Sequence, residues 1–243
     1  TVSDASGDEG SAISLHVGAA LTDIDGSESL SITIAGVPAG ATLSAGTNNG
    51  DGTWTLAPNQ LSGLTILPPV NSSNDFTLTV TATSTEADGD TATNVATFGV
   101  SVAGVADAAT VTVGNISVLE DSGAIPLNIG AQFPDADGSE TQTITISGVA
   151  GGAMLSAGTN NGNGTWTLTP AQLQGLTLTP GLNSSDDLQL TVTATSTEDG
   201  TTATTTKSLG IAIEGVADVP SLSVTNATGF EDSAIGLNIQ SAL

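Results

Sequence analysis

The chain has 243 residues, a single basic residue (Lys207), 25 acidic residues and a formal net charge of −24. Nucleic acid is therefore excluded as a natural partner, and an anionic membrane surface is disfavoured, because both bind through Lys and Arg. The chain has no Cys and no apolar run near the roughly 18 residues of a membrane span, so disulfides, thiolate sites and membrane insertion are not expected.

One sequence pattern recurs along the chain. Asp135 follows Asp23 by 112 positions, and Trp166 follows Trp54 by the same offset. A period of 111 to 112 residues indicates tandem domains. The predicted domains are 1–107 (repeat 1), 108–218 (repeat 2) and 219–243 (the start of a third repeat). Because Thr1 does not open a signal peptide, we expect the sequence to begin and end within a longer protein.

Each copy is predicted to be β throughout. Leu30, Ile32 and Ile34 alternate with polar residues, as does the segment 188–194, and this period of two predicts strands with one buried face. Asn-Gly pairs such as those in 161–164 favour hairpin turns. With about seven to nine short strands per copy, the sequence predicts an all-β fold, made of tandem antiparallel β-sandwich domains of immunoglobulin-like or cadherin-like type in a rod.

Each copy also contains a short segment between Pro and Gly and a single Trp. Pro58–Gly63 and Pro170–Gly175 each begin with Pro and end with Gly, which is typical of one turn of helix. Trp54 and Trp166 are the largest aromatic residues of their copies, and we interpret them as core anchors. The alternative is that a Trp forms a platform on which a sugar stacks.

Acidic residues gather between the predicted strands. The segment Asp135-Ala136-Asp137-Gly138-Ser139-Glu140 has a close copy at Asp23–Glu28. On an extended backbone Asp135 and Asp137 point the same way and repel one another unless a cation lies between them. Oxygen ligands of this kind suit a hard cation, calcium above all. An EF-hand is excluded, because its twelve-residue loop would end at Ile146 instead of Glu.

Other candidate sites are weaker. The acidic loop Glu86–Asp90 shortens to Glu198–Gly200 in the second copy, and we interpret it as a solvated loop tip. His16 is the only His and has no counterpart in repeat 2, which favours a strand-surface role. No Ser has a matching His and Asp in each copy, and no Arg or Tyr lines a cleft, so we expect no enzymatic activity.

The motifs occur in the order Glu-Asp-Ser, Asp-x-Asp-Gly-Ser-Glu, Leu-Ser-Ala-Gly-Thr, Gly-Thr-Trp-Thr-Leu and Val-Ala-Asp. This order resembles the tandem repeats of giant type I secreted RTX adhesins of Gram-negative bacteria. The resemblance implies an extender, or stalk, of a secreted cell-surface protein in adhesion or biofilm formation, with calcium stiffening the domain junctions. The family's glycine-rich nonapeptides and secretion signal are absent from this sequence, as in an internal fragment.

The arrangement also resembles cadherin domains, in which a Glu of the first loop, a linker Asp and the next domain's Asp-x-Asp share calcium ions. With the expected strand order, this resemblance places a complete metal site at the junction of the two repeats. Its predicted ligands are Asp8, Glu9, Asp75, Asp107, Asp135, Asp137 and Glu140. A second, incomplete junction would use Glu120, Asp121, Asp187 and Asp218, and the N-terminal pole would use Asp23, Asp25 and Glu28.

Two alternatives stay open. The junction acids are either calcium ligands or merely solvated loop carboxylates. The function is either a stalk or a glycan- or surface-binding module, and near-identical loops in successive copies favour the stalk. The expected partners are calcium ions and the neighbouring repeats of the same chain, in a monomeric rod on the bacterial surface.

Overall fold

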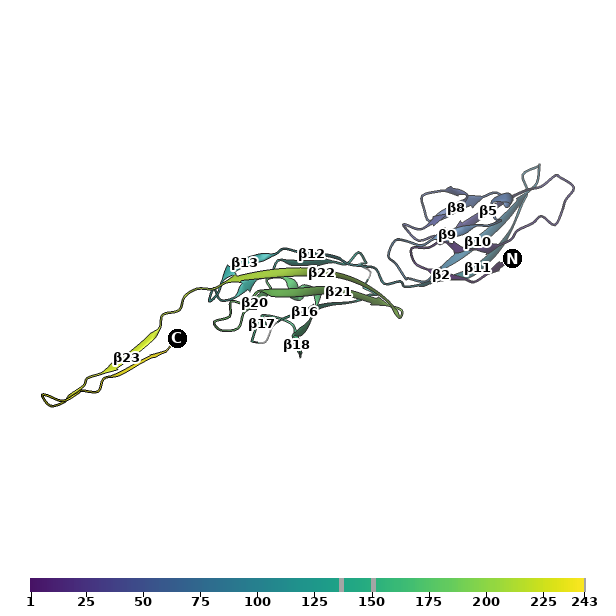
Figure 1. Cartoon of the computed structure of the whole chain (residues 1–243). Coiled ribbons are helices and arrows are strands. Elements are labelled where there is room, and N and C mark those ends of the chain that lie inside the picture. Colours follow the sequence, from purple (N-terminus) through teal and green to yellow (C-terminus); the bar gives the residue numbers. More distant parts are fainter. Residues whose placement is uncertain (136–137, 150–151, 243) are drawn as a thin grey trace.

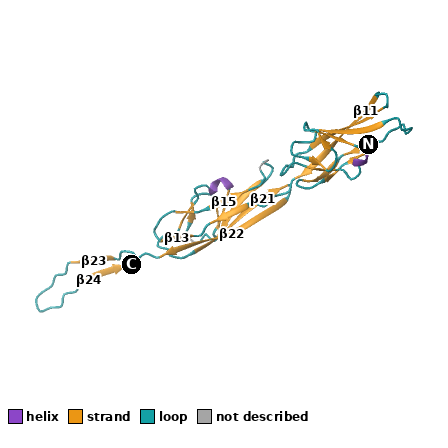
Figure 2. Cartoon of the chain, turned by 90° about the horizontal axis from the view of Figure 1, so that it is seen from above, coloured by secondary structure: helices purple, strands orange, loops and turns teal. Residues whose placement is uncertain are grey.

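The structure, a computed structural model, describes residues 1–135, 138–149 and 152–242. Two β-sandwiches lie end to end, and a two-stranded hairpin continues in the same direction (Figure 1). A second view of the chain, coloured by secondary structure, shows the same extended arrangement (Figure 2). The predicted all-β fold class is confirmed.

The first sandwich has two main sheets. A six-stranded sheet has the order β2-β11-β10-β5-β8-β7 and faces a three-stranded sheet β3-β9-β6, while β1 pairs with β4. The strands are β1 (Val2–Ser3), β2 (Ala5–Asp8), β3 (Ile13–Ser14), β4 (His16–Val17), β5 (Ser29–Ala35), β6 (Thr42–Leu43), β7 (Thr47–Asn48), β8 (Thr53–Leu56), β9 (Thr65–Leu67), β10 (Phe76–Thr85) and β11 (Thr91–Ala103).

The second sandwich repeats this topology. Its sheets are β13-β22-β21-β16-β19-β18 and β14-β20-β17, with β12 paired to β15. The strands are β12 (Thr110–Val113), β13 (Ile116–Leu119), β14 (Ile125–Pro126), β15 (Ile129–Gln132), β16 (Thr141–Ser147), β17 (Met154–Leu155), β18 (Thr159–Gly162), β19 (Thr165–Leu168), β20 (Thr177–Thr179), β21 (Leu188–Glu198) and β22 (Thr201–Glu214).

Each sandwich has more strand segments than the seven to nine predicted. The chain switches between sheets after β1, and β2 then pairs in parallel with β11. The equivalent β13 pairs in parallel with β22. Each switch divides one strand into two, because the backbone must leave one sheet before it joins the other. These parallel pairs are exceptions to the expected antiparallel pattern.

The alternating pattern forms two separate cores. Ile32 and Ile34 are fully buried in the first core, as are Ile144 and Ile146 in the second. Trp54 and Trp166 belong to these cores and are 8% and 6% exposed, which confirms them as core anchors. Because the indole rings are covered, neither offers a face for sugar stacking.

The two helix predictions are confirmed. They correspond to the short 3-10 helices η1 (Pro58–Gln60) and η2 (Pro170–Leu173). In η1 the Gln60 side chain accepts a hydrogen bond from the Ala57 amide at 2.8 Å, and Gln172 accepts one from Thr169 at 2.8 Å. No helix in the described part of the chain is long and apolar enough to cross a membrane.

Strand directions decide which acidic segments meet. Because β11 leads into the linker and β2 runs parallel to it, Glu9 lies at the C-terminal pole of the first sandwich. The strand β16 begins beside the β21–β22 turn, so Asp135 and Glu140 share a pole with Glu198. That pole faces the first sandwich, since β22 runs from this turn toward the next linker.

The C-terminal hairpin consists of β23 (Ser221–Thr225) and β24 (Asn238–Ala242). It corresponds to the β12–β15 pair of repeat 2, with the same antiparallel pairing. The predicted domain limits at residues 107 and 218 fall in the two linkers, between β11 and β12 and between β22 and β23. They remain predictions of where each repeat folds independently.

The fully buried Ile146 provides a test of the second core. Changing Ile146→Ala should reduce the free energy of unfolding of repeat 2 by about 2–5 kcal/mol, since it removes buried apolar volume and leaves a cavity. Urea unfolding followed by Trp166 fluorescence in a Trp54→Phe background measures this. The control Met154→Ala removes a 59% exposed side chain and should change stability by less than about 0.5 kcal/mol. Equal effects from both substitutions would contradict the described core.

Candidate metal centre

Glu9 is fixed at the end of the first sandwich by two backbone contacts. Its amide donates to the Ala103 carbonyl at 2.9 Å, and its Oε1 accepts the Val105 amide at 2.7 Å. These bonds continue the β2–β11 pairing into the linker. The Glu9 side chain is buried, with 7% of its surface exposed. Its Oε2 is also buried and has no hydrogen-bond partner.

Glu198 reaches the same place from the second sandwich. It is the last residue of β21, is 4% exposed, and neither carboxylate oxygen has a hydrogen-bond partner. Its side chain packs so closely on Gly104 that a Cβ there would overlap the Glu198 carboxylate. Gly104 is therefore required by the close approach of the carboxylate to the linker backbone.

Three buried carboxylates meet at this point. Glu9, Asp135 and Glu198 each offer an oxygen, and these oxygens lie within 4.8 Å of one another. They come from the first sandwich, the loop before β16 and the end of β21. The chain's one basic side chain, Lys207, is exposed in the middle of β22, opposite Val192. Within the described residues, the carboxylates therefore meet without a basic side chain to neutralise them.

Glu140 and Asp107 extend the cluster. Glu140 Oε1 accepts the Asp107 amide at 2.7 Å and also the Ser196 hydroxyl, which leaves its Oε2 buried without a partner. Burial raises the pKa of Asp107, and the nearby charges of Glu140, Asp135 and Glu198 raise it further. The linker carboxylate thus faces the same negative environment as the buried three.

Two more bonds, besides that of Glu140 to the Asp107 amide, join the second sandwich to the linker backbone. The Gly104 amide donates to Asp199 Oδ2 at 3.0 Å, and the Ala106 amide donates to Thr201 Oγ1 at 2.7 Å. The turn that connects β21 and β22 therefore holds linker amides directly, while Glu198 contributes to the acidic cluster. These contacts position the linker without a bound ion.

The structure brings only part of the predicted central set together. Glu9, Asp107, Asp135 and Glu140 gather at the junction, whereas Asp137 lies outside the described residues. Asp8 is exposed on β2, and the Asp75 carboxylate accepts the Val102 amide at 2.8 Å and the Ser101 hydroxyl at 3.1 Å. Asp75 therefore holds the start of β10 against β11.

The interpretation of Glu198–Gly200 as a solvated tip is wrong for Glu198, which is buried. It is the last residue of β21, at the pole that also holds Asp135, so the strand-order argument that placed Asp135 also identifies Glu198. The corresponding turn of repeat 1 is at the opposite end of the molecule, where Glu86 raises the pKa of Glu28 in addition to the larger effect of burial. Glu28 and Glu86 thus occupy the positions of Glu140 and Glu198.

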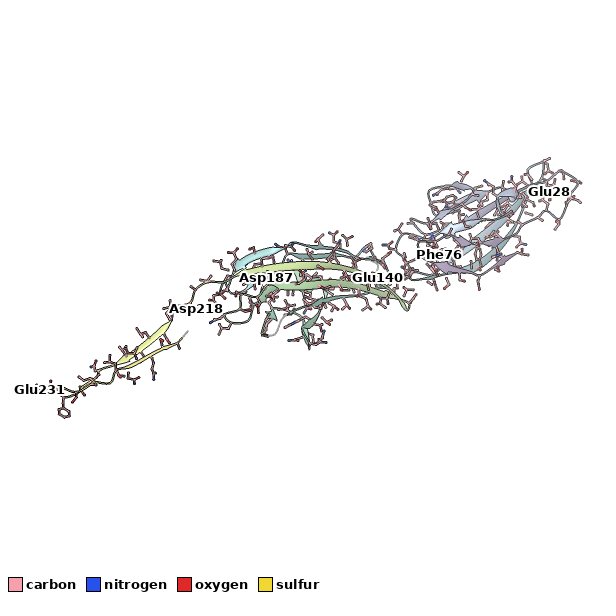
Figure 3. The ribbon with its side chains drawn as sticks, viewed as in Figure 1. Glu28, Phe76, Glu140, Asp187, Asp218 and Glu231 are labelled. Carbon is pink, nitrogen blue, oxygen red and sulfur yellow. The ribbon has the colours of Figure 1, made fainter. Side chains whose placement is uncertain are left out.

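The second junction starts in the same way as the first. The Glu120 amide donates to the Glu214 carbonyl at 2.8 Å, its Oε1 accepts the Val216 amide, and Asp187 accepts the Ile213 amide at 2.9 Å. Asp121 and Asp218 are exposed. Figure 3 shows Asp218 in the linker and Glu231, the next copy of this Glu, at the far end of the hairpin.

The aspartates of the N-terminal pole, Asp23 and Asp25, are exposed, unlike the buried carboxylates of the central junction. Asp25 accepts the Ser27 amide at 2.8 Å and the Ser27 hydroxyl at 2.6 Å, and these bonds lower the pKa of Asp25. Asp23 accepts the Asp25 amide at 3.0 Å. Glu28 lies at this far end of the first sandwich, whereas Glu140 lies where the two sandwiches meet (Figure 3).

The central site suits a hard divalent cation. All its donors are carboxylate oxygens, and the chain has no Cys and only one His, on β4. Calcium takes about six to eight oxygens and accepts bidentate carboxylates. Glu9, Glu140 and Glu198 supply buried oxygens that have no hydrogen-bond partner, and Asp135 and Asp107 add further carboxylates. Such a set without a counter-charge favours calcium over softer metals.

No protein-family model matches the chain, and no curated protein matches it. Among solved structures, the chain is similar to protocadherin gammaB7 EC3-6, with a TM-score of 0.45 and 12% identity, over 90% of this chain and 46% of that one. It is also similar to mouse cadherin-23 EC22-24, with a TM-score of 0.43 and 11% identity, over 98% of this chain and 74% of that one. These values are too low to carry ligands or activities over to this chain.

The acidic cluster predicts an unusual pH dependence for the metal-free protein. Burial and the neighbouring Glu198 and Asp135 raise the pKa of Glu9 from 4.5 to about 7, although the Val105 amide opposes the shift. Between these two values the folded state holds a proton that the unfolded chain releases, so the contribution of Glu9 to stability is complete below about pH 4.5 and is lost as the pH rises through 7.

We therefore expect the metal-free protein to unfold at a higher temperature at pH 5.5 than at pH 8, as measured by calorimetry. The substitution Glu9→Gln should reduce the difference in unfolding temperature between pH 5.5 and pH 8, and should stabilise the metal-free protein at pH 8. Asp51→Asn, which removes an exposed charge, should leave this difference unchanged. The same difference in Glu9→Gln and in the unsubstituted protein would rule out Glu9 as its source.

Proposed function

We propose that the chain is a structural extender whose domain junctions are stiffened by calcium. The observation that carries the proposal is the meeting of Glu9, Asp135 and Glu198, with oxygens within 4.8 Å and no basic side chain beside them in the described residues. Burying several carboxylates together is costly unless a cation or a proton neutralises them. Calcium would supply that charge at the one place where both sandwiches contribute ligands.

The residues that would hold calcium come from three parts of the chain. Glu9 belongs to repeat 1, Asp107 to the linker, and Asp135, Glu140 and Glu198 to repeat 2. An ion bound to all of them restricts rotation of one sandwich against the other, because any large rotation separates its ligands. Repetition of such junctions gives length and stiffness without catalysis or a dedicated ligand cleft.

The wider setting belongs to the same proposal. A secreted, cell-surface adhesin stalk of the RTX type, in adhesion or biofilm formation, combines extracellular calcium with a Cys-free acidic chain. The near-identical turn and strand motifs of the two repeats support a spacer, since a ligand-binding domain is expected to differ from its neighbours. We expect such a stalk to be monomeric and to have no enzymatic activity.

Calcium removal tests the site by thermal unfolding. If free calcium exceeds the dissociation constant about a hundredfold, binding stabilises the folded state by about 2.7 kcal/mol, or roughly 10 °C in the midpoint of a domain of this size. We expect chelation to remove this gain, and Glu198→Gln to reduce it strongly. The matched control is Asp51→Asn, because repeat 2 has Asn163 at this position. A midpoint that does not respond to calcium would eliminate the metal from the proposal.

Small-angle scattering tests the stiffening itself. The maximum dimension of the unsubstituted chain should be larger and better defined with calcium than with chelator, because the junction ligands hold the sandwiches in line. Glu198→Gln in calcium should resemble the chelated protein. Identical scattering profiles with and without calcium, in a protein that binds it, would show that the ion stabilises a domain without stiffening the rod.

A further inference from the structure

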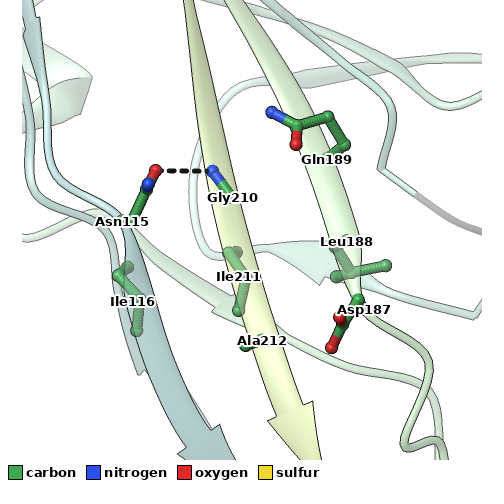
Figure 4. Close-up of a pocket in the computed structure, with 8 residues that line it drawn as sticks. All are labelled: Asn115, Ile116, Asp187, Leu188, Gln189, Gly210, Ile211 and Ala212. Atoms are coloured by element: carbon green, nitrogen blue, oxygen red, sulfur yellow. Dashed lines mark hydrogen bonds between the residues drawn. The ribbon is translucent and has the colours of Figure 1, made fainter.

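A shallow groove lies beside the point where the chain switches sheets in repeat 2. Asn115 borders it on one side, and Asp187–Gln189 and Gly210–Ala212 form the rest with Ile116 (Figure 4). The first sandwich has the same groove at equivalent positions, bordered by Asp4, Asp75–Thr77 and Gly99–Ser101. A feature that recurs at matching positions in both repeats points to a shared structural task.

The side chain at the switch makes one specific bond in each repeat. Asp4 Oδ1 accepts the Gly99 amide at 2.8 Å, and Asn115 Oδ1 accepts the Gly210 amide at 3.0 Å (Figure 4). In repeat 1, parallel pairing begins at the next position, with Ala5 opposite Val100. The Asp4 side chain thus takes the place of a strand carbonyl immediately before the ladder starts.

The spacing from this residue to the junction Glu is constant in all three copies. An Asp or Asn stands five positions before the Glu in Asp4/Glu9, Asn115/Glu120 and Asn226/Glu231. The last strand has a matching spacing, because Gly99 stands five positions before Gly104, and Gly210 five before Gly215. Two equal spacings on paired strands are what a fixed register requires.

The strand β2 is therefore bracketed by side-chain bonds at both ends. Asp4 holds the Gly99 amide before the strand, and Glu9 holds the Val105 amide after it. A slip of one residue would turn Ala5 out of the core and carry Glu9 away from Asp135 and Glu198. The position of the Glu9 carboxylate thus depends on a register that is set at the opposite end of the strand.

Repeat 1 depends on this bond more than repeat 2 does. The residues of β2 are Ala-Ser-Gly-Asp, so Ala5 is its only apolar side chain in the core. In β13, Ile116 and Val118 both pack against the second core and help to fix the register by themselves. Hydrophobic side chains therefore fix the register of β13, whereas the register of β2 depends on the polar bond from Asp4.

We propose that Asp4 is a positioning residue for the junction, because it sets the register of β2 and so places Glu9 in the carboxylate cluster. The effect on metal binding rests on the proposed calcium site, but the effect on register does not. Since Asn115 performs the same task without a charge, the acceptor oxygen at this position is what matters.

The test compares Asp4→Ala with the conservative Asp4→Asn in the full chain. Asp4→Ala removes the acceptor of the Gly99 amide, which should weaken calcium binding about tenfold by calorimetric titration and should speed amide hydrogen exchange at Val105 in the metal-free protein. Asp4→Asn should stay within about twofold of the unsubstituted protein. Asn115→Ala should speed exchange at Val216 by a smaller factor, since Ile116 and Val118 remain.

The outcomes separate this inference from the calcium proposal. If Asp4→Ala binds calcium normally and keeps Val105 protected, or if Asp4→Asn is as impaired as Asp4→Ala, the positioning role is overturned. If the unsubstituted protein does not bind calcium, the calcium proposal fails, and exchange at Val105 still decides the role of Asp4. Should Asp4→Ala not fold, Asp4→Ser, which keeps only a shorter acceptor, must show the same weakening relative to Asp4→Asn.

Discussion

The arrangement of this molecule depends on carboxylates from two domains that are buried against one another, with no basic side chain beside them in the described residues. Glu198 is the extreme case, since both its oxygens are buried and lack hydrogen-bond partners while its side chain packs on Gly104. Such a group is tolerated only if a cation or a proton neutralises the cluster. The stability of the junction is thereby linked to the charge state of the cluster, whereas the two hydrophobic cores are separate sets of buried apolar side chains.

The order of the strands brings acidic motifs of the two repeats together at one junction. In each repeat the last strand leads into the linker, and the parallel β2 or β13 delivers a Glu to the same end. The loop before β5 or β16 and the final hairpin turn lie at the opposite end, so each repeat carries acidic residues at both poles. The short linker between the two repeats brings these residues together into a carboxylate cluster that neither repeat contains alone.

Several residues around the junction hold the backbone and do not join the acidic cluster. Asp75 and Asp187 each accept an amide of the final strand, and Asp199 and Thr201 hold amides of the linker. These bonds involve protein atoms alone. Backbone amides hold the Glu9 and Glu140 side chains in place, so an ion that bound to the cluster would meet ligands that are already ordered, which would reduce the entropy lost on binding.

The sequence by itself determined the repeat period, the β-sandwich class, the single helical turns and the core roles of Trp54 and Trp166, because periodicity and turn chemistry are local properties. It also placed Glu9 and Asp135 at one junction through strand order. Only the tertiary structure decided that Glu198 is buried there and that Asp8 and Asp75 lie apart from the buried carboxylates. Those outcomes depend on which way a side chain points at the end of a strand and on how closely Gly104 lets a second domain approach, and neither is encoded in local sequence.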